Sequence, residues 1–248
     1  MDAYWEDKEA GLALYLGDMR EVLPALGVQA DLVCTDPPYS ETSLAWDRWP
    51  DGWPALAATV ASSMWCFGSM RMFLDRHDQF TGWRLSQDVV WRKNAGSSFT
   101  ADRFKRVHEF ALHWYRGDWS GVHHQAARQP HYGRNEGLVR SVTSAGPAHT
   151  GEIDKLTWVD DGTRMVTSVI DAKNLRGLAI HPTQKPLGII TPLLTYACPP
   201  GGLVLDPFAG SGSTLDAARQ SDRRAIGIEA SEEYCEAAAR RLSALTLP

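Results

Sequence analysis

Short apolar segments of strand length alternate with helix-forming segments along most of the chain, and this alternation limits the possible folds more than any other feature. Residues 12–16, 65–67 and 203–205 are three such runs, and each is followed by a turn and a helical pattern. Strands that are linked by helices tend to lie parallel, with helices packed on both faces of the sheet. The pattern therefore predicts an α/β fold with a doubly wound, mostly parallel sheet.

The same criteria predict the remaining elements. Further strands are expected at 31–35, 85–91, 110–115 and 225–228, and helices after residue 18, up to residue 73, over 184–197, from about residue 213 and after residue 231. Asp18 and Ser231 are expected to cap the helices that follow them, and Gly27 to end the first of these helices. Pro192 is expected to kink or shorten the helix over 184–197, because proline has no N–H to donate.

Composition indicates a globular protein. Of the 248 residues, 44% are hydrophobic and 22% are charged, both near the globular average. No apolar run reaches the roughly 18 residues of a membrane helix, and the acidic start of the chain is unlike a secretory signal. The four cysteines stand apart in apolar surroundings, which favours reduced core thiols and excludes paired zinc ligands. We therefore expect a cytoplasmic protein with no membrane contact and no metal site.

Basic residues are concentrated in one part of an acidic chain. The formal net charge is -5, yet residues 84–140 contain ten Lys and Arg against five Asp and Glu. A concentrated basic zone can bind nucleic-acid phosphates even when the total charge is negative. The alternative is a solvated face that happens to be basic.

Residues 117–178 interrupt the regular pattern. Gly, Ser, Thr, His and Arg dominate there, and the periodicity of strands and helices fades. We expect an insert of loops and short elements, with 1–116 and 179–248 forming the two halves of one domain.

A Gly-rich turn follows the apolar run at 203–205. Gly210 and Gly212 can take up positive φ and let the backbone approach a ligand closely, and Glu229 ends the next strand, where a carboxylate can accept both hydroxyls of a ribose. Leu215 stands where a dinucleotide fingerprint has its third glycine, and no lysine precedes Ser213 as in a P-loop. The turn therefore suits a nucleoside ligand without phosphate. The alternative is an ordinary tight turn beside a surface acid.

A second motif, Asp36-Pro37-Pro38-Tyr39, follows the strand at 31–35. The prolines fix the backbone and have no N–H, so the carbonyls of Asp36 and Pro37 can point into a cleft as acceptors for an NH2 group. Tyr39 offers a flat face on which a planar base can stack. The alternative is a strand-ending turn in which Asp36 caps the backbone.

Taken together, this tetrapeptide and the segment Asp-Pro-Phe-Ala-Gly-Ser-Gly-Ser-Thr at 206–214 resemble motifs of the DNA amino-methyltransferases, which methylate adenine N6 or cytosine N4. The tetrapeptide comes first, and this order resembles the β group of the family. The hexapeptide His-Pro-Thr-Gln-Lys-Pro at 181–186 resembles a further cofactor-side motif of that group. The resemblance covers about 1–116 and 179–248. It implies a Rossmann-like methyltransferase fold with circularly permuted motif order, in which 117–178 is a small target-recognition insert.

The resemblance also implies S-adenosyl-L-methionine as cofactor and assigns residues to the site. The implied catalytic residues are Asp36, Pro37, Pro38 and Tyr39, and the implied cofactor-binding residues are Asp18, Thr183, Gln184, Lys185, Asp206, Phe208, Gly210, Gly212, Thr214 and Glu229. Asp36 and Pro37 would bind the target amino group, and Tyr39 would stack on a flipped base. Glu229 would hold the ribose and Asp18 would face the adenine of the cofactor. The loop over 40–54, which is rich in tryptophan, would either fold over the DNA or form a small satellite core.

Double-stranded DNA is the implied substrate. Arg92, Lys93, Arg103, Lys105 and Arg106 are expected to hold phosphates, and Arg128, Arg134 and Arg140 to contact base edges. Aspartate at position 36 resembles the adenine-N6 enzymes, whereas serine is usual in the cytosine-N4 enzymes. Cytosine-N4 transfer and an inactive, cofactor-binding regulator that binds DNA remain open alternatives. The resemblance is compatible with a homodimer and with a restriction endonuclease partner, and the sequence decides neither.

Overall fold

The computed structural model describes residues 1–97, 102–131, 137–142, 156–173 and 184–244. The predictions for Thr183 and Arg134 lie outside these residues, as do those for 181 and 182; for Arg140 only the backbone is described. The chain divides into two compact units, Met1–Gln125 with Ser168–Pro248, and Ala126–Thr167.

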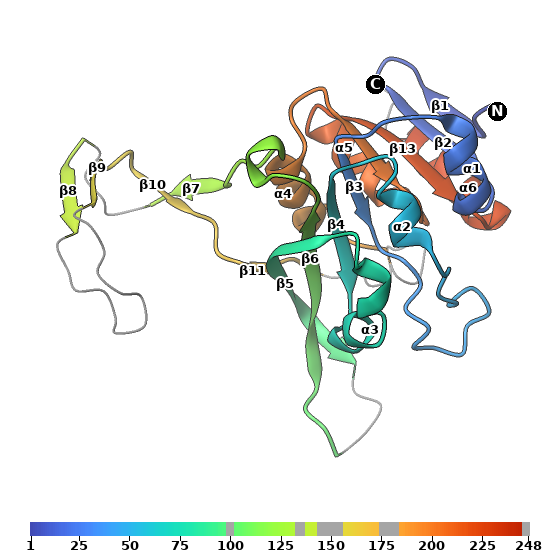
Figure 1. Ribbon diagram of the computed structural model, residues 1–248, viewed down its shortest axis with the longest axis horizontal. Helices are drawn as coiled ribbons and strands as arrows, with labels where there is room; N and C mark the ends of the chain where they lie inside the picture. The colour runs from blue at the N-terminus through green and yellow to red at the C-terminus, as the bar shows by residue number, and fades with distance from the viewer. Residues whose placement is uncertain (98–101, 132–136, 143–155, 174–183, 245–248) are drawn as a thin grey trace. The chain divides into compact units, whose positions relative to one another are not determined.

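The larger unit is built on a nine-stranded sheet with the order β1-β2-β13-β12-β3-β4-β6-β5-β11 (Figure 1). In this order the strands are β1 (Trp5–Asp7), β2 (Leu12–Leu16), β13 (Arg224–Glu229), β12 (Leu203–Asp206), β3 (Leu32–Thr35), β4 (Ser63–Gly68), β6 (Arg106–Tyr115), β5 (Arg84–Ser97) and β11 (Val169–Asp171). Strands β2, β13, β12, β3 and β4 are all parallel to their neighbours in this run, while β1, β6 and β5 add antiparallel pairs. The predicted mostly parallel sheet is confirmed.

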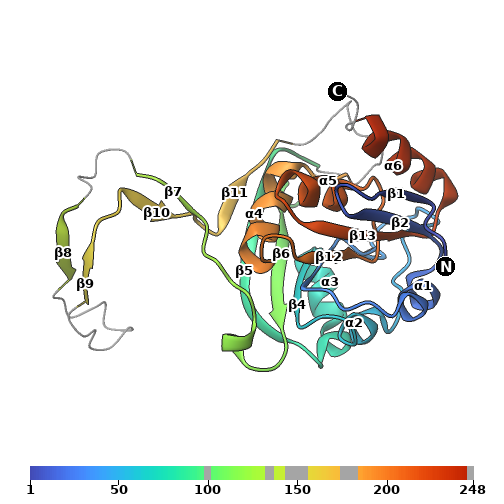
Figure 2. The same ribbon diagram turned by 90° about the horizontal axis from the view of Figure 1, so that it is seen from above.

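Helices cover both faces of this sheet, as predicted. They are α1 (Met19–Leu26), α2 (Trp53–Ala57), α3 (Met70–Asp75), α4 (Leu187–Ala197), α5 (Ser213–Gln220) and α6 (Glu232–Ala244), with short 3-10 turns η1 (His77–Phe80) and η2 (Trp119–Gly121). Figure 2 shows α1, α2 and α3 on one side of the sheet and α4, α5 and α6 on the other. Each face of the sheet has its own hydrophobic core, and alternate residues of β4 contribute to one or the other. Trp65 and Phe67 pack with α4, whereas Met64 and Cys66 pack with α2 and α3. Because both faces are covered, the central strands β3, β4 and β12 are apolar except at their ends.

The predicted helix boundaries hold where a cap defines them. The Asp18 carboxylate accepts the Arg20 N–H at 2.8 Å, and Gly27 ends α1 in the left-handed region at φ 59°. Helix α4 begins at Leu187, later than expected, since Pro186 is its N-cap. It then continues through Pro192 to Ala197, so the proline does not shorten it. The buried apolar face of α4, packed on the sheet, compensates for the backbone hydrogen bond that Pro192 cannot make.

Strands β5 and β6 are longer than the apolar pattern predicts. Residues 110–115 of β6 pair with β4, but β6 begins at Arg106 and so extends past the end of β4, paired there only with β5. Most of the residues added at 106–109 are polar, and Arg106 and Val107 are exposed because the ladder there continues beyond the core, whereas the Glu109 side chain is mostly buried.

The smaller unit, over 126–167, contains only short strands in its described residues. Strand β7 (Arg128–Pro130) pairs with β10 (Thr163–Met165), and β8 (Val139–Val142) pairs with β9 (Leu156–Val159), both antiparallel. The Arg128 guanidinium forms an ion pair with Asp161 at 3.0 Å within this unit.

The cysteines Cys34, Cys66, Cys198 and Cys235 are buried free thiols. Over the described ranges, no helix has the length and apolarity needed to span a bilayer. Nor do those ranges bring together three His, Cys, Asp or Glu side chains that could hold a metal ion.

Candidate active site

The site lies where two neighbouring parallel strands end. Strand β3 pairs with β12, yet the chain runs from β3 to β4 on one side and from β12 to β13 on the other. Ligands of open α/β sheets bind at such a switch point, beyond the carboxyl ends of the strands. Asp36 follows β3 and Asp206 ends β12. The topology therefore brings together two motifs that stand about two-thirds of the chain apart.

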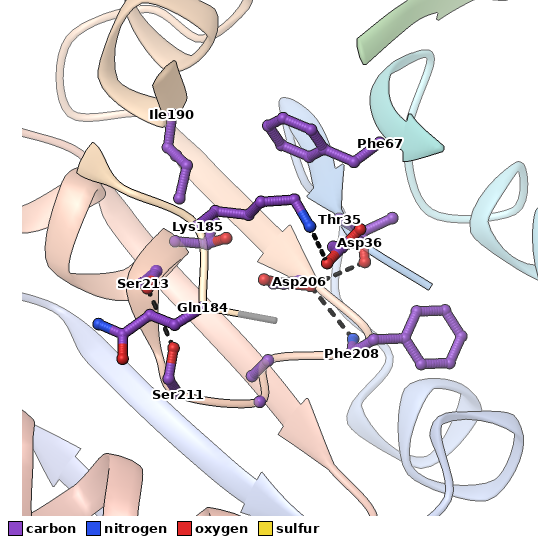
Figure 3. A pocket seen from close by; sticks show the side chains of 13 residues that line it. Thr35, Asp36, Phe67, Gln184, Lys185, Ile190, Asp206, Phe208, Ser211 and Ser213 are labelled. Atoms are coloured by element: carbon purple, nitrogen blue, oxygen red, sulfur yellow. Dashed lines mark hydrogen bonds and ion pairs between the residues drawn. The ribbon is translucent and has the colours of Figure 1, made fainter. Parts of the chain in front are cut away.

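A narrow cavity of about 50 Å³ lies directly at these strand ends. Its lining includes Asp36, Gln184, Lys185, Asp206, Phe208, Gly210 and Thr214, together with Thr35, Phe67, Ser211 and Ser213. Figure 3 shows the Lys185 side chain reaching across the cavity toward Asp36. Seven of the residues predicted for the site thus meet around one space.

Asp206 is buried and held by its neighbours. Its carboxylate accepts the Thr35 hydroxyl at 2.8 Å and the Phe208 backbone N–H at 3.1 Å (Figure 3). Burial raises the pKa of Asp206 to about 6, although hydrogen bonds from Thr214 and Thr35 oppose the rise. The carboxylate is therefore fixed in position at the floor of the cavity.

A wider cavity of about 420 Å³ adjoins the narrow one, because Phe208 and Gly210 line both. Its lining also includes Asp18, Pro38, Arg48, Glu229 and Tyr234, with the indoles of Trp46 and Trp49. Aromatic rings and acceptor oxygens together suit a planar heterocycle carrying hydroxyl groups.

Glu229 fixes the wall of the wider cavity. One carboxylate oxygen accepts the Gly210 N–H at 2.8 Å, and the other accepts the Ser231 N–H at 2.9 Å. Burial raises the pKa of Glu229 above its ordinary value, while these backbone N–H groups lower it. Each carboxylate oxygen can accept a second hydrogen bond. Glu229 can therefore hold the turn and a ligand hydroxyl at the same time.

The two glycines of the turn have different roles. Both have positive φ, 50° at Gly210 and 72° at Gly212. Gly210 lines both cavities, but a Cβ at Gly212 would come within 3.1 Å of Leu242 and 3.5 Å of Ala238 on α6. Gly212 therefore lets α6 pack closely against the turn, a role the sequence did not suggest.

The tetrapeptide after β3 presents its carboxylate with two partners. The Tyr39 hydroxyl donates to Oδ1 of Asp36, and the Lys185 ammonium donates to Oδ2. Pro37 is buried, and Asp36 is half-buried. Burial raises the pKa of Asp36, while Lys185 opposes the rise. Lys185, predicted to close the cofactor pocket, thus also pairs with the predicted catalytic carboxylate.

The loop over 40–52 is held by a buried aspartate. The Asp47 carboxylate accepts backbone N–H groups from Ser40, Glu41 and Thr42 at 2.7, 3.0 and 2.7 Å. Within 40–54, Trp49 and Trp53 pack in the core beside α2, and both Trp46 and Trp49 line the wider cavity. Two of the three tryptophans of this segment therefore belong to a core.

The basic side chains of β5 and β6 fall into two groups. Arg103, Lys105 and Arg106 lie on the exposed part of the hairpin, beside a fully exposed Phe104. Lys93 instead turns inward and forms an ion pair with Glu109, with its side chain only 21% exposed. Arg92 is exposed and paired with Asp171. The position of Lys93 links it to the active site rather than to the outer surface.

Several residues of the site were not predicted from the sequence. Thr35, Phe67, Ser211 and Ser213 line the narrow cavity, and Arg48 and Tyr234 line the wider one. Glu109 contacts Lys185 at 3.5 Å. One signal for Glu109 was available, since it is a single acid at the start of the apolar run 110–115. Ser211 and Ser213 also stand within the Gly-rich segment 206–214, whereas the others carried no signal, because their role depends on tertiary position alone.

The chain is similar in sequence to a type II methyltransferase and to a putative methylase. The chain is 27% identical over 267 aligned residues to the type II methyltransferase M.ScaI of Streptomyces caespitosus, covering 97% of this chain and 84% of that protein. A 65-residue segment is 54% identical to the putative methylase YubD of Escherichia coli (strain K12), but covers only 26% of this chain and 29% of that protein.

Solved structures share the fold. The M1.HpyAVI-SAM complex matches with a TM-score of 0.66 and 24% identity, over 93% of this chain and 98% of that one. The cytosine-N4-specific PvuII DNA methyltransferase matches with a TM-score of 0.60 and 17% identity, over 93% and 86% of the two chains. The family model described as DNA methylase, N6_N4_Mtase, matches residues 30–240. The chain belongs to the N6/N4 DNA methylase family.

Proposed function

We propose that this DNA methyltransferase transfers the methyl group of S-adenosylmethionine to N6 of adenine in double-stranded DNA. One observation carries the proposal: Asp36 of the tetrapeptide lines the same narrow cavity as Asp206 and Gly210 of the Gly-rich turn. A group held by the tetrapeptide and a molecule held by the turn would therefore meet in one small space, as direct transfer between them requires.

The two adjoining cavities fit S-adenosylmethionine. The wider one offers Glu229 for the ribose hydroxyls and the rings of Trp46, Trp49 and Tyr234 around a space large enough for adenine. The narrow one, with Asp206 and Lys185, would take the methionine part. Two proteins of similar fold, M1.HpyAVI and TTHA0409 of Thermus thermophilus, have been solved as complexes with this cofactor, which supports the same ligand here.

The residues beside the narrow cavity would prepare the amino group for transfer. When bound, the cofactor supplies a methyl group on a positively charged sulfur. An exocyclic amino nitrogen is a poor nucleophile, because its lone pair is delocalised into the ring. Asp36 and the Pro37 carbonyl would accept its two N–H groups and so favour a tetrahedral nitrogen whose lone pair points toward the methyl group. Because the nitrogen loses its proton only after it has become cationic, Asp36 need not be a strong base.

The target base must leave the duplex to reach this cavity. In the proposed complex Tyr39 stacks on the extruded base, and its hydroxyl bond to Asp36 fixes the ring. Arg103, Lys105 and Arg106 of the β5–β6 hairpin bind phosphates, and Arg128 of the smaller unit contacts bases.

Cytosine N4 is the second candidate target. The similarity in fold to the cytosine-N4-specific PvuII enzyme supports it, whereas aspartate at position 36 supports adenine. Incubation of unmethylated genomic DNA with methyl-labelled cofactor, followed by digestion to nucleosides, distinguishes the two. We expect label in N6-methyladenine, and label in N4-methylcytosine would refute the adenine assignment.

A matched variant tests whether the tetrapeptide performs the transfer. Asp36→Ala should abolish incorporation while leaving DNA binding intact. If the wild-type protein transferred no methyl group to any DNA and both proteins bound DNA equally well, the chain would be a binding regulator rather than an enzyme.

A homodimer and a restriction endonuclease partner complete the proposal. The similarity to M.ScaI, which is named a type II methyltransferase, supports the partner. Sedimentation of the purified protein tests the dimer. Resistance of methylated DNA to a panel of type II endonucleases would reveal the partner's recognition sequence.

A further inference from the structure

Four charged side chains form a chain of ion pairs beside the narrow cavity. Lys93 on β5 pairs with Oε1 of Glu109 on β6, Lys185 lies 3.5 Å from Oε2 of Glu109, and Lys185 also donates to Asp36. The side chains of Glu109 and Lys185 are only 13% and 7% exposed. Two carboxylates and two ammonium groups thus neutralise one another in a mostly buried position.

Stability alone does not account for this arrangement. Burying charges costs several kcal/mol for each ion, and a buried ion pair is often no more stabilising than apolar side chains of the same volume. The neighbouring positions on β6, Ala111 and Leu112, are apolar and buried, so an apolar residue at 109 would fit the pattern of the strand. A buried acid at this place therefore indicates a role in the site.

The contacts show how that role is exerted. An ionised carboxylate has about four acceptor positions. Tyr39 and Lys185 each occupy one, on different oxygens of Asp36, which leaves about two for a bound amino group. Lys185 in turn lies between Asp36 and Glu109, so Glu109 limits where the ammonium group can sit. The orientation of the Asp36 carboxylate therefore depends on both Lys185 and Glu109.

We propose that Glu109 is a positioning residue for the methyl transfer, which holds the Lys185 ammonium so that the free acceptor positions of Asp36 face the narrow cavity. The inference rests on the proposed function and deepens it. Glu109 does not line the cavity and is not itself a catalytic residue; it acts through Lys185. Burial raises the pKa of Glu109, but Lys185 and Lys93 together lower it below its ordinary value and so keep the acid ionised.

Replacement of Glu109 and replacement of Lys185 should move the pKa of Asp36 in opposite directions. The groups that face Asp36 are Tyr39, Lys185 and Glu109, with the thiols of Cys34 and Cys66 and the Asp206 carboxylate nearby. Lys185 lowers the pKa of Asp36 and Glu109 raises it. Glu109→Gln should therefore lower the pKa of Asp36, whereas Lys185→Met should raise it.

The experiment compares wild type, Glu109→Gln, Lys185→Met and the matched control Asp88→Asn. Asp88 is an exposed acid on β5, so this control makes the same carboxylate-to-amide change on the same hairpin. Carboxyl ¹³C NMR titration gives the Asp36 midpoint in each protein, assigned from the signal that is lost in Asp36→Asn. Methyl incorporation into unmethylated genomic DNA gives kcat and the KM for S-adenosylmethionine.

We expect Glu109→Gln to lower the Asp36 midpoint and to reduce kcat on the order of 10- to 100-fold, the effect of a small displacement of a reacting group, with the cofactor KM unchanged. Asp88→Asn should match wild type in both measurements. An unchanged Asp36 midpoint, or an unchanged kcat, in Glu109→Gln would overturn the inference.

The design separates this inference from the proposed function. If wild type transferred no methyl group, the proposed function would fail, and the NMR midpoints alone would decide whether Glu109 acts on Asp36. Should Glu109→Gln fail to fold in a thermal melt, Glu109→Gln/Lys93→Met removes both charges of this ion pair, and the reduction of kcat alone then tests the inference, which an unchanged kcat would overturn.

Discussion

Replacing Gly212 by alanine tests the packing of the Gly-rich turn against α6. Gly212 has φ 72°, and an added Cβ would approach Leu242 to 3.1 Å and Ala238 to 3.5 Å. The left-handed conformation costs an alanine about 1–2 kcal/mol. Overpacking a filled core adds roughly 1–3 kcal/mol. Gly212→Ala should therefore lower the free energy of unfolding by about 3 kcal/mol, the sum of these two effects.

Gly27→Ala is the matched control. Gly27 has φ 59°, and nothing lies within 4 Å of its added Cβ among the described residues, so this variant carries the conformational cost without the contact. A chain of this length loses about 2–4 °C of melting temperature for each kcal/mol. We expect a fall of roughly 6–12 °C for Gly212→Ala and of roughly 3–6 °C for Gly27→Ala in thermal unfolding. Equal falls would refute the packing argument.

Three further outcomes follow from the geometry. Glu229→Gln should weaken the binding of S-adenosylmethionine by about 1.5–3 kcal/mol, which is the value of a hydrogen bond to a charged group. Calorimetry measures this affinity, and an unchanged value would show that Glu229 does not hold the ribose. Burial raises the pKa of Asp206 to about 6, whereas an aspartate in the unfolded chain releases its proton at about pH 4. Between these pH values the folded protein holds a proton that the unfolded chain has lost. The free energy of unfolding should therefore fall by roughly 3 kcal/mol as the pH rises from about 4 to 6. Urea unfolding across this range should show the fall in wild type and a flatter profile in Asp206→Asn; identical profiles would contradict it. Arg103→Ala/Lys105→Ala should reduce the slope of log affinity for DNA against log salt by about 1.8, since each phosphate contact contributes about 0.9, and an unchanged slope would place the DNA elsewhere.

Local signals in the sequence were enough to predict seven of the nine strands of the central sheet, but not the short edge strands β1 and β11. The strand Leu12–Leu16, the Asp18 cap and the Gly27 stop each depend on residues a few positions apart, so composition and spacing determine them. The order of the strands did not follow from such signals. The resemblance of the two motifs implied only that both serve one site, and the pairing of β3 with β12 that places Asp36 near Asp206 is a finding of the structure.

The ion pairs around Asp36 could not be predicted in the same way. Lys185 and Asp36 are 149 residues apart, and Lys93 and Glu109 face each other only because β5 and β6 are paired. Lys93 was expected on the DNA surface, because sequence gives the charge of a side chain but not the face of the strand to which it points. Gly212 is a similar case, since Leu242, which packs against it, lies on the separate helix α6 further along the sequence.

The strand order has a consequence for synthesis of the chain. Strands β12 and β13 come from residues 203–229, yet they lie between β2 and β3, which come from the first 35 residues. On the ribosome, β2 and β3 emerge early with their facing edges unpaired, and their partners follow only after residues 36–202 have been made. Pairing between such distant segments is slow, and an unpaired strand edge invites association with other chains. Truncation before residue 203 should therefore yield an aggregating product rather than a smaller folded domain.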